Sequence, residues 1–268
     1  MIRLADYEKP KKADRATYDD DLRALQYELQ LVQAAYITQG LKGIVAVEGW
    51  DAGGKGGLIK RMTAELDPRY TKVWPIGAPT REELAHHFLW RFWQRLPGSK
   101  EIAVFDRSWY GRVLVERVDR LTPEAVWRTG YDTIAAFEAD QVADGARLVK
   151  VFLHITQDEQ DKQFRERLET PHKRWKTGRE DYHNRSMRSA YVEAYEEMFA
   201  RSPLPWVVIA GDDKKAARLA GLRAVIDGLS AGVDLSFPEI DPELRRVAEA
   251  AIGPLNPAST SAGTTTGD

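Results

Sequence analysis

Short apolar runs alternate along the chain with longer stretches in which apolar residues recur every three or four positions. The runs lie at 43–48, 72–76, 102–105, 148–155 and 206–210, and their length predicts buried β-strands. The longer stretches predict helices at 17–39, 55–66, 81–96, 123–143, 157–178, 180–200 and 213–230. This alternation indicates an α/β protein with a five-stranded parallel sheet covered by helices on both faces, in three αβα layers.

Local signals mark two of the helix ends. Thr80 and Glu83 form the S/T-x-x-E pattern of a capping box, which predicts that a helix begins there. Gly40 ends the helix at 17–39, whose single apolar face predicts contact either with the core or with a second copy of the chain. Residues 1–16 are polar and are expected to be irregular.

Composition narrows the class of protein. The 268 residues are 43% hydrophobic and 30% charged, which suits one globular domain at 1–252, followed by a small, polar tail at 253–268 that we expect to be disordered. The sequence has no cysteine and no apolar leader, so disulfides and thiolate metal sites are excluded and the expected location is cytoplasmic. No apolar stretch suits a membrane span, and a net charge of −2 argues against general nucleic-acid binding.

A glycine-rich segment follows the first predicted strand. Gly49, Gly54 and Lys55 fit the frame G-x-x-x-x-G-K between a strand and a helix. Such a loop points successive N–H groups into one concavity, and the helix N-terminus adds positive charge. We therefore predict a phosphate-binding loop rather than a glycine-rich surface turn. Its predicted binding residues are Gly53, Gly54, Gly56 and Gly57, followed by Lys60 and Arg61, with Lys55 as the catalytic cation.

One position departs from the usual loop. Gly56 stands where Ser or Thr normally holds Mg²⁺, so another group must do so. Asp51 is the nearest carboxylate, and an acid inside a phosphate loop is unfavourable unless a cation lies between it and the phosphates. We predict that Asp51 is a metal ligand; the alternative is an N-cap of the next helix.

A second acidic motif follows the third predicted strand. Asp106 ends that strand and is predicted to hold or order Mg²⁺ beside the phosphate loop, unless it caps the next helix. Arg107, Arg112 and Arg117 come next and suit the capture of phosphate oxygens. The alternative for each arginine is an ordinary salt bridge with Glu116 or Asp119.

The stretch 162–179 is strongly basic, with seven Lys and Arg residues against two Glu. It is interrupted by Pro171 and closed by Gly178, which indicates a hinged lid at about 157–185 that closes over phosphates. The alternative is a solvated basic helix. The lid residues expected to bind polyphosphate are Arg165, Lys173, Arg174 and Lys176.

Four segments together resemble the polyphosphate kinase 2 family: EGWDAGGKGG, HHFLWRFWQRLP, IAVFDRSWYGRVLVERV and TPHKRWK. They occur in the family's order, and the resemblance covers roughly 17–232. It implies a P-loop kinase core with a helical lid and Mg²⁺-dependent phosphoryl transfer between polyphosphate and nucleotides. By motif, the resemblance assigns catalytic roles to Asp51, Lys55, Asp106, Arg107, Arg112 and Glu116.

The segments are most similar to the catalytic half of polyphosphate:AMP phosphotransferases. We therefore expect AMP as the first acceptor and ADP as the second, with GMP and GDP as further purine acceptors and Mn²⁺ as a substitute for Mg²⁺. A homo-oligomer, dimer or tetramer, is also expected. Two alternatives remain: a nucleotide kinase that uses ATP as donor, and a P-loop regulatory switch that binds nucleotide without phosphoryl transfer.

Overall fold

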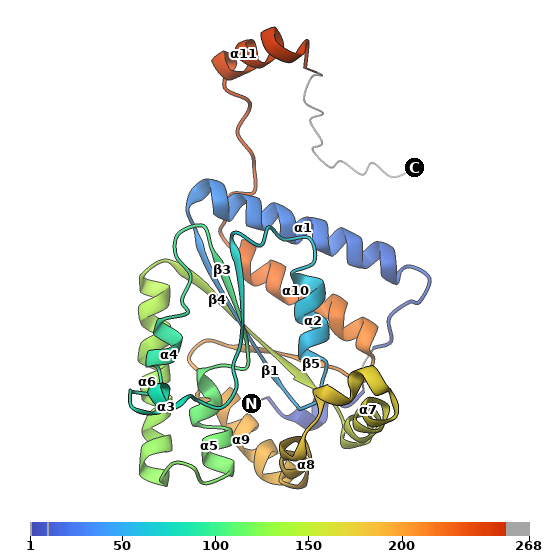
Figure 1. Ribbon diagram of the computed structural model, residues 1–268, viewed down its shortest axis with the longest axis vertical. Helices are drawn as coiled ribbons and strands as arrows, with labels where there is room; N and C mark the ends of the chain where they lie inside the picture. Colours follow the sequence, from blue (N-terminus) through green and yellow to red (C-terminus); the bar gives the residue numbers. More distant parts are fainter. Residues whose placement is uncertain (1, 10, 256–268) are drawn as a thin grey trace. The chain divides into compact units, whose positions relative to one another are not determined.

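The computed structural model describes residues 2–9 and 11–255 and has one parallel sheet at its centre (Figure 1). Its strands are β1 (Lys42–Gly49), β2 (Thr71–Pro75), β3 (Ile102–Asp106), β4 (Ala146–His154) and β5 (Trp206–Ala210). The strand order is β2-β3-β1-β4-β5, so the five predicted strands and their parallel arrangement are confirmed. Because β1 has β3 on one side and β4 on the other, the loop after β1 lies where the strand order reverses, a place where such sheets bind ligands.

Alternate residues of a strand point to opposite faces of the sheet. In β1 both sets are apolar, so both faces are apolar. Ile44 and Ala46 belong to a core cluster with α6 and α9, while Val45 and Val47 belong to a second cluster with α1, α2 and α10. The sheet therefore forms the middle of three layers (Figure 1). The long helices are α1 (Tyr18–Gln39), α6 (Glu124–Ala143), α7 (Gln157–Glu169), α9 (Arg188–Arg201) and α10 (Lys214–Ser230). The shorter ones are η1 (Leu4–Tyr7), α2 (Lys55–Met62), α3 (Arg81–Leu84), α4 (Trp90–Trp93), η2 (Trp109–Arg112), α5 (Val115–Val118), η3 (Pro171–Lys176), α8 (Arg179–Ser186) and α11 (Pro242–Ile252).

Helix α1 faces the core of its own chain. Leu29, Val32 and Tyr36 are almost fully buried, and the Tyr36 hydroxyl donates a hydrogen bond to the Leu229 carbonyl on α10 at 2.8 Å. Gly40 ends the helix in the left-handed conformation, as its position predicted. Of the two interpretations of this apolar face, contact with the core is the one the structure contains.

The predicted helix at 81–96 is wrong as a continuous element, because the structure has two short helices, α3 and α4, in its place. The capping box of Thr80 and Glu83 is present. The Glu83 carboxylate, however, also contacts Arg91 at 3.4 Å and Arg95 at 2.9 Å. In one straight helix Glu83 and Arg95 would lie about 18 Å apart, so the chain must fold back to pair them.

Other boundaries differ on a smaller scale. The predicted helix at 180–200 is divided at Met187 into α8 and α9, and the one at 157–178 ends at Glu169 before η3. The phosphate-loop helix ends at Met62 rather than 66. The sequence analysis missed η1, η2, α5 and α11, most of which are single turns with little periodicity.

The chain divides into two compact units, and the second begins at Ser236. That unit contains α11, whose side chains Leu244, Val247 and Ile252 are exposed. The division falls earlier than the predicted end of the domain at residue 252. The tail predicted to be disordered lies outside the described residues from 256 onward.

A fully buried ion pair lies between the sheet and α6. Lys150 Nζ on β4 contacts Glu138 Oε2 on α6 at 2.7 Å, and both side chains are 0% exposed. The ammonium also donates to the Tyr110 hydroxyl at 2.7 Å and to Ser202 Oγ. Burial lowers the pKa of Lys150 to about 8 although the Glu138 carboxylate opposes this. The bonds to Tyr110 and Ser202 attach η2 and the end of α9 to the centre of the sheet.

Replacing Glu138 with alanine should lower the free energy of unfolding by about 3–5 kcal/mol, because the Lys150 ammonium would lose its carboxylate partner. Chemical denaturation measures this change. The control is Glu124→Ala on the same helix, where an exposed pair with Arg128 is lost and the change should stay below about 1 kcal/mol. Equal effects of the two substitutions would contradict the prediction.

Candidate active site

The phosphate loop runs from Gly49 at the end of β1 to Lys55 at the start of α2. Gly49 has φ +142, and a Cβ there would lie 2.4 Å from the Leu153 carbonyl oxygen, so only glycine fits beside β4. Gly54 takes the left-handed conformation just before the helix. The strand, loop and helix therefore occur in the arrangement that the motif predicted.

Lys55 is folded back onto its own loop. Its Nζ donates to the Gly49 carbonyl at 2.6 Å and to the Trp50 carbonyl at 3.0 Å. Burial lowers its pKa, while the charges of Asp51, Asp106 and Glu48 act in the opposite direction. Lys55 thus shares one electrostatic environment with both predicted metal ligands.

Asp51 is held by groups from three other elements. Its Oδ1 accepts from Arg107 at 2.7 Å, its Oδ2 accepts from Asn184 at 2.9 Å, and its backbone oxygen accepts from Gln160 at 2.9 Å. Burial would raise the pKa of Asp51, but the charges of Lys55 and Arg107 outweigh it, so the pKa lies below its usual value. The N-cap of α2 is Gly54, so the structure does not support the capping alternative for Asp51.

Asp106 ends β3 directly opposite Val47 of β1. The next helix, η2, has Ser108 as its N-cap, so Asp106 is not its cap. Arg107 follows in the left-handed region, with φ +67, an unfavourable conformation for a residue with a Cβ. This turn directs its guanidinium to Asp51, whose charge raises the pKa of Arg107 against the effect of burial. Asp51, Lys55, Asp106 and Arg107 are therefore brought together as predicted.

Glu48, the last residue before the glycine of the loop, is a buried carboxylate that the sequence analysis missed. Its Oε1 accepts from both the backbone N–H and the hydroxyl of Ser108 at 2.7 Å. Burial raises its pKa despite these bonds. Glu48 connects β1 to the turn that contains Asp106 and Arg107. A carboxylate at the end of an apolar strand is the same signal that singled out Asp106.

Arg112, Glu116 and Arg117 are not brought to this loop. Arg112 Nη1 contacts Glu116 Oε2 at 2.7 Å and donates to Thr122 Oγ1 at 2.9 Å. Arg117 Nη1 contacts Glu197 Oε2 at 2.7 Å on α9. Both arginines thus form salt bridges in this structure, with Glu197 in place of Asp119 as the partner of Arg117. Their roles in phosphate binding stay predictions.

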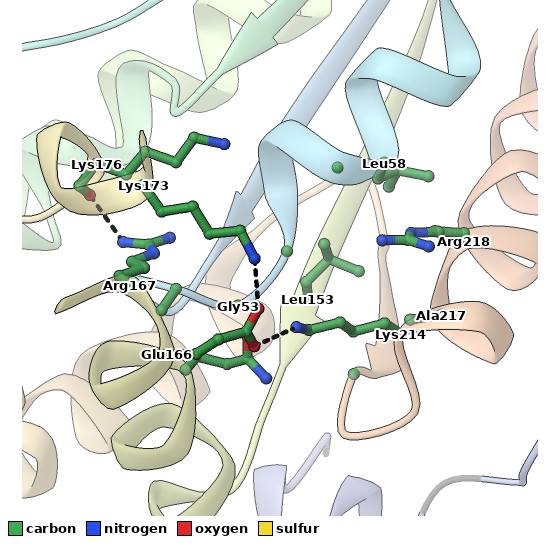
Figure 2. A pocket seen from close by; sticks show the side chains of 15 residues that line it. Gly53, Leu58, Leu153, Glu166, Arg167, Lys173, Lys176, Lys214, Ala217 and Arg218 are labelled. Carbon is green, nitrogen blue, oxygen red and sulfur yellow. Dashed lines mark hydrogen bonds and ion pairs between the residues drawn. The ribbon is translucent and has the colours of Figure 1, made fainter. Parts of the chain in front are cut away.

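A pocket of about 230 Å³ lies beside the phosphate loop (Figure 2). It is lined by loop residues, by the basic segment after β4 and by the start of α10. Its charged lining residues are Glu166 and Arg167 of α7, Lys173 and Lys176 of η3, and Lys214 and Arg218 of α10. Five cations against one carboxylate give the pocket a net positive charge, which suits a polyanion. The sequence analysis found Lys173 and Lys176 but missed Lys214 and Arg218, which only the fold brings to the loop.

The other predicted basic residues lie elsewhere. Lys60 and Arg165 are exposed, Arg174 donates to the Leu168 carbonyl at 2.8 Å, and Arg61 donates to the Gly57 carbonyl at 3.0 Å. None of these four residues is among the described residues that line the pocket. Trp175 of η3 is 80% exposed.

The carboxylates suit a metal that is shared with phosphate. Within the described residues no group of three or more His, Asp and Glu side chains could hold a metal alone. Mg²⁺ is commonly bound through one or two carboxylates together with substrate phosphates and water. Asp51 and Asp106 supply such a pair beside a phosphate loop, so the donor set fits Mg²⁺.

The indole ring of Trp50 in the loop is held by one residue of β4 and one of α9. Its Nε1 donates to His154 Nδ1 at 2.8 Å, and the Arg188 guanidinium lies 3.9 Å from its ring centroid. His154 Nε2 is buried without a hydrogen-bond partner among the described residues. Burial, and then the charge of Arg188, lower the pKa of His154 to about 4, so the ring is neutral when folded at neutral pH.

Comparison with known proteins identifies the family. The family model described as polyphosphate kinase 2 matches residues 12–233. The chain belongs to this family. The chain is 42% identical over 234 residues to the polyphosphate:AMP phosphotransferase of Acinetobacter johnsonii, covering 86% of this chain and 48% of that protein. It is also 39% identical over 213 residues to ADP-polyphosphate phosphotransferase 2 of Rhizobium meliloti, covering 78% and 70%.

A solved polyphosphate kinase 2 from Arthrobacter aurescens TC1 has the same fold. Its TM-score is 0.81 at 30% identity, over 90% of this chain and 88% of that one. The resemblance to this family and the P-loop kinase-like fold are therefore confirmed. The chain spans about half the length of the AMP phosphotransferase that it matches. In the described part of the chain, none of the helices has the length and apolar character of a membrane span.

Lowering the pH should destabilise the protein through His154. The pKa of the His154 ring is 6.5 in the unfolded state and about 4 in the folded state. Between these two pH values the unfolded state binds more protons, so the free energy of unfolding decreases as the pH is lowered. The contribution between pH 7 and pH 4 is about 3 kcal/mol. His154→Gln should remove this part of the slope in denaturation experiments at several pH values, whereas His172→Gln at an exposed position of η3 should not. Identical slopes in wild type and His154→Gln would refute it.

Proposed function

We propose that this chain transfers a phosphoryl group from inorganic polyphosphate to AMP, with ADP as its second acceptor and Mg²⁺ as its cofactor. The carrying observation is the cation-lined pocket that continues from the phosphate loop of a polyphosphate kinase 2 family member. A donor with many phosphates needs a longer positive surface than the loop alone offers. Lys173 and Lys176 of the lid and Lys214 and Arg218 of α10 supply it.

The choice of acceptor follows the relatives. A relative named for AMP is 42% identical and one named for ADP is 39% identical, so AMP comes first and ADP second. Three further points stay predictions from the resemblance. They are GMP and GDP as additional acceptors, Mn²⁺ as a substitute metal, and a dimer or tetramer as the assembly.

The chain's own residues would act by alignment and by charge neutralisation. A phosphate oxygen of the acceptor nucleotide attacks the terminal phosphorus of polyphosphate. The bond from that phosphorus to the bridging oxygen breaks, which leaves the polyphosphate one phosphate shorter. Lys55 would exchange its loop carbonyls for phosphate oxygens, and Arg107 would bind phosphate from the opposite side. Asp51 and Asp106 would hold Mg²⁺, which neutralises phosphate charge when bound.

The first test is a nucleotide panel with polyphosphate as the only donor. Purified protein with Mg²⁺, polyphosphate and AMP, ADP, GMP or GDP should form the next higher nucleotide, fastest with AMP. Product should be measured by chromatography, with parallel reactions that contain ATP as donor. Turnover with ATP alone would favour an ATP-dependent nucleotide kinase. Tight nucleotide binding without any transfer would favour a regulatory switch.

Asp106→Asn should lower kcat by at least about 100-fold, because it removes one of two carboxylates beside the transferred group. The melting temperature should stay close to that of wild type, since asparagine keeps the size of the side chain and Asp106 acts on Lys55 and Arg107 through its charge, with no salt bridge within 4 Å among the described residues. Asp140→Asn, an exposed carboxylate on α6, is the matched control and should keep full activity. Wild-type turnover in Asp106→Asn would end its assigned role.

A further inference from the structure

Glu166 is the one carboxylate among the described residues that line the cationic pocket. It lies on α7, and its two oxygens reach in different directions (Figure 2). Oε1 accepts from Lys173 Nζ of the lid at 2.6 Å, and Oε2 accepts from Lys214 Nζ of α10 at 3.4 Å. A single side chain thus connects two cations from two separate elements.

The remaining cations of the pocket are not neutralised in this way. Arg167 donates to the Lys176 carbonyl at 2.9 Å, and Arg218 donates to the Tyr18 hydroxyl at 3.5 Å. In the described part of the chain, no carboxylate forms a salt bridge with Arg167, Lys176 or Arg218. Glu166 therefore pairs with two of the five cations, while the other three have no carboxylate partner among the described residues and stay available to an anion.

The contacts of Glu166 are of the kind that can be exchanged. The side chains of Glu166, Lys173 and Lys214 are 42%, 35% and 40% exposed, so water screens both ion pairs. A phosphate group offers the same two lysines more acceptor oxygens than a carboxylate does. Once a phosphate has taken them, Glu166 is a negative charge left close to a polyanion, which is unfavourable.

We propose that Glu166 is a specificity-determining residue: it occupies the position of a phosphate between Lys173 and Lys214 and must be displaced by the donor chain. The identity of that donor as polyphosphate rests on the proposed function. A single phosphate that enters here gains little beyond what Glu166 already provided. A chain of phosphates also reaches Arg167, Lys176 and Arg218, and this offsets the loss. Glu166 therefore lowers the affinity for every anion but favours a chain of phosphates over a single one.

The central variant is Glu166→Gln, which keeps the size of the side chain and an acceptor oxygen but removes the charge. The KM for polyphosphate should fall about fivefold, which corresponds to the loss of one screened like-charge contact. The KM for nucleotide and the kcat should change less than about twofold, since the carboxylate is released from the lysines during turnover. A role confined to holding the lid lysines in place would instead raise the KM for polyphosphate.

Two further variants make the comparison specific. Glu169→Gln removes the same charge from an exposed position on the same helix and outside the pocket, so the KM for polyphosphate should not move. Lys214→Gln should raise that KM. In the double variant Glu166→Gln/Lys214→Gln the benefit of removing Glu166 should persist, because repulsion between carboxylate and phosphate does not require Lys214.

Direct binding separates this proposal from the proposed function. Calorimetry with inorganic tripolyphosphate should show about fivefold tighter binding to Glu166→Gln than to wild type, and orthophosphate should gain relatively more than tripolyphosphate. If tripolyphosphate binds but no phosphoryl group is transferred, the proposed function fails while the ratio of affinities still decides the role of Glu166. Equal or weaker binding to Glu166→Gln, or no binding to either protein, would overturn the proposal.

Discussion

The ion pair between Asp51 and Arg107 joins the two motifs on which the candidate site depends. Asp51 belongs to the loop after β1 and Arg107 to the turn after β3, and these strands are neighbours in the sheet. Neither residue is placed by local structure alone, because Arg107 has a left-handed backbone and Asp51 lies in a glycine-rich loop. The attraction between their opposite charges helps to offset the cost of these conformations, and Asn184 of α8 donates a hydrogen bond to the same carboxylate.

Charge is distributed unevenly in this chain. The whole sequence has a net charge of −2, yet the pocket beside the loop has five cations and one carboxylate. Positive side chains outside the pocket, such as Arg112 and Arg117, are paired with glutamates and packed against aromatic rings. The pocket therefore places three cations without a carboxylate partner among the described residues close together beside the phosphate loop, where they can attract a polyanion although the net charge of the chain is negative.

The parts of the site that could be predicted are those that depend on short-range order. Asp51, Lys55 and Asp106 follow apolar runs, and parallel strands bring their carboxyl ends to one edge. Glu48 also follows an apolar run, so its place at the same edge of the sheet could have been predicted in the same way. Lys214 and Arg218 could not be found in this way, because their helix reaches the loop only through the order of the strands.

The predicted helix at 81–96 shows where prediction from local signals fails. Its capping box was read correctly, since that signal lies within four residues. Its interruption brings Glu83 into contact with Arg91 and Arg95, a tertiary contact that periodicity does not encode. Long, buried elements such as α1 and β4 were predicted closely because burial dominates their composition.

Lys55 has a wider consequence for how such a loop works. Its ammonium donates to two carbonyl oxygens of the same loop, so the side chain stabilises the loop to which it belongs. A phosphate bound by Lys55 would therefore replace these bonds instead of adding to them, and the net gain per contact would be small. When such an anion leaves, Lys55 would regain its two carbonyl acceptors, so the same exchange would favour reversible binding over tight retention.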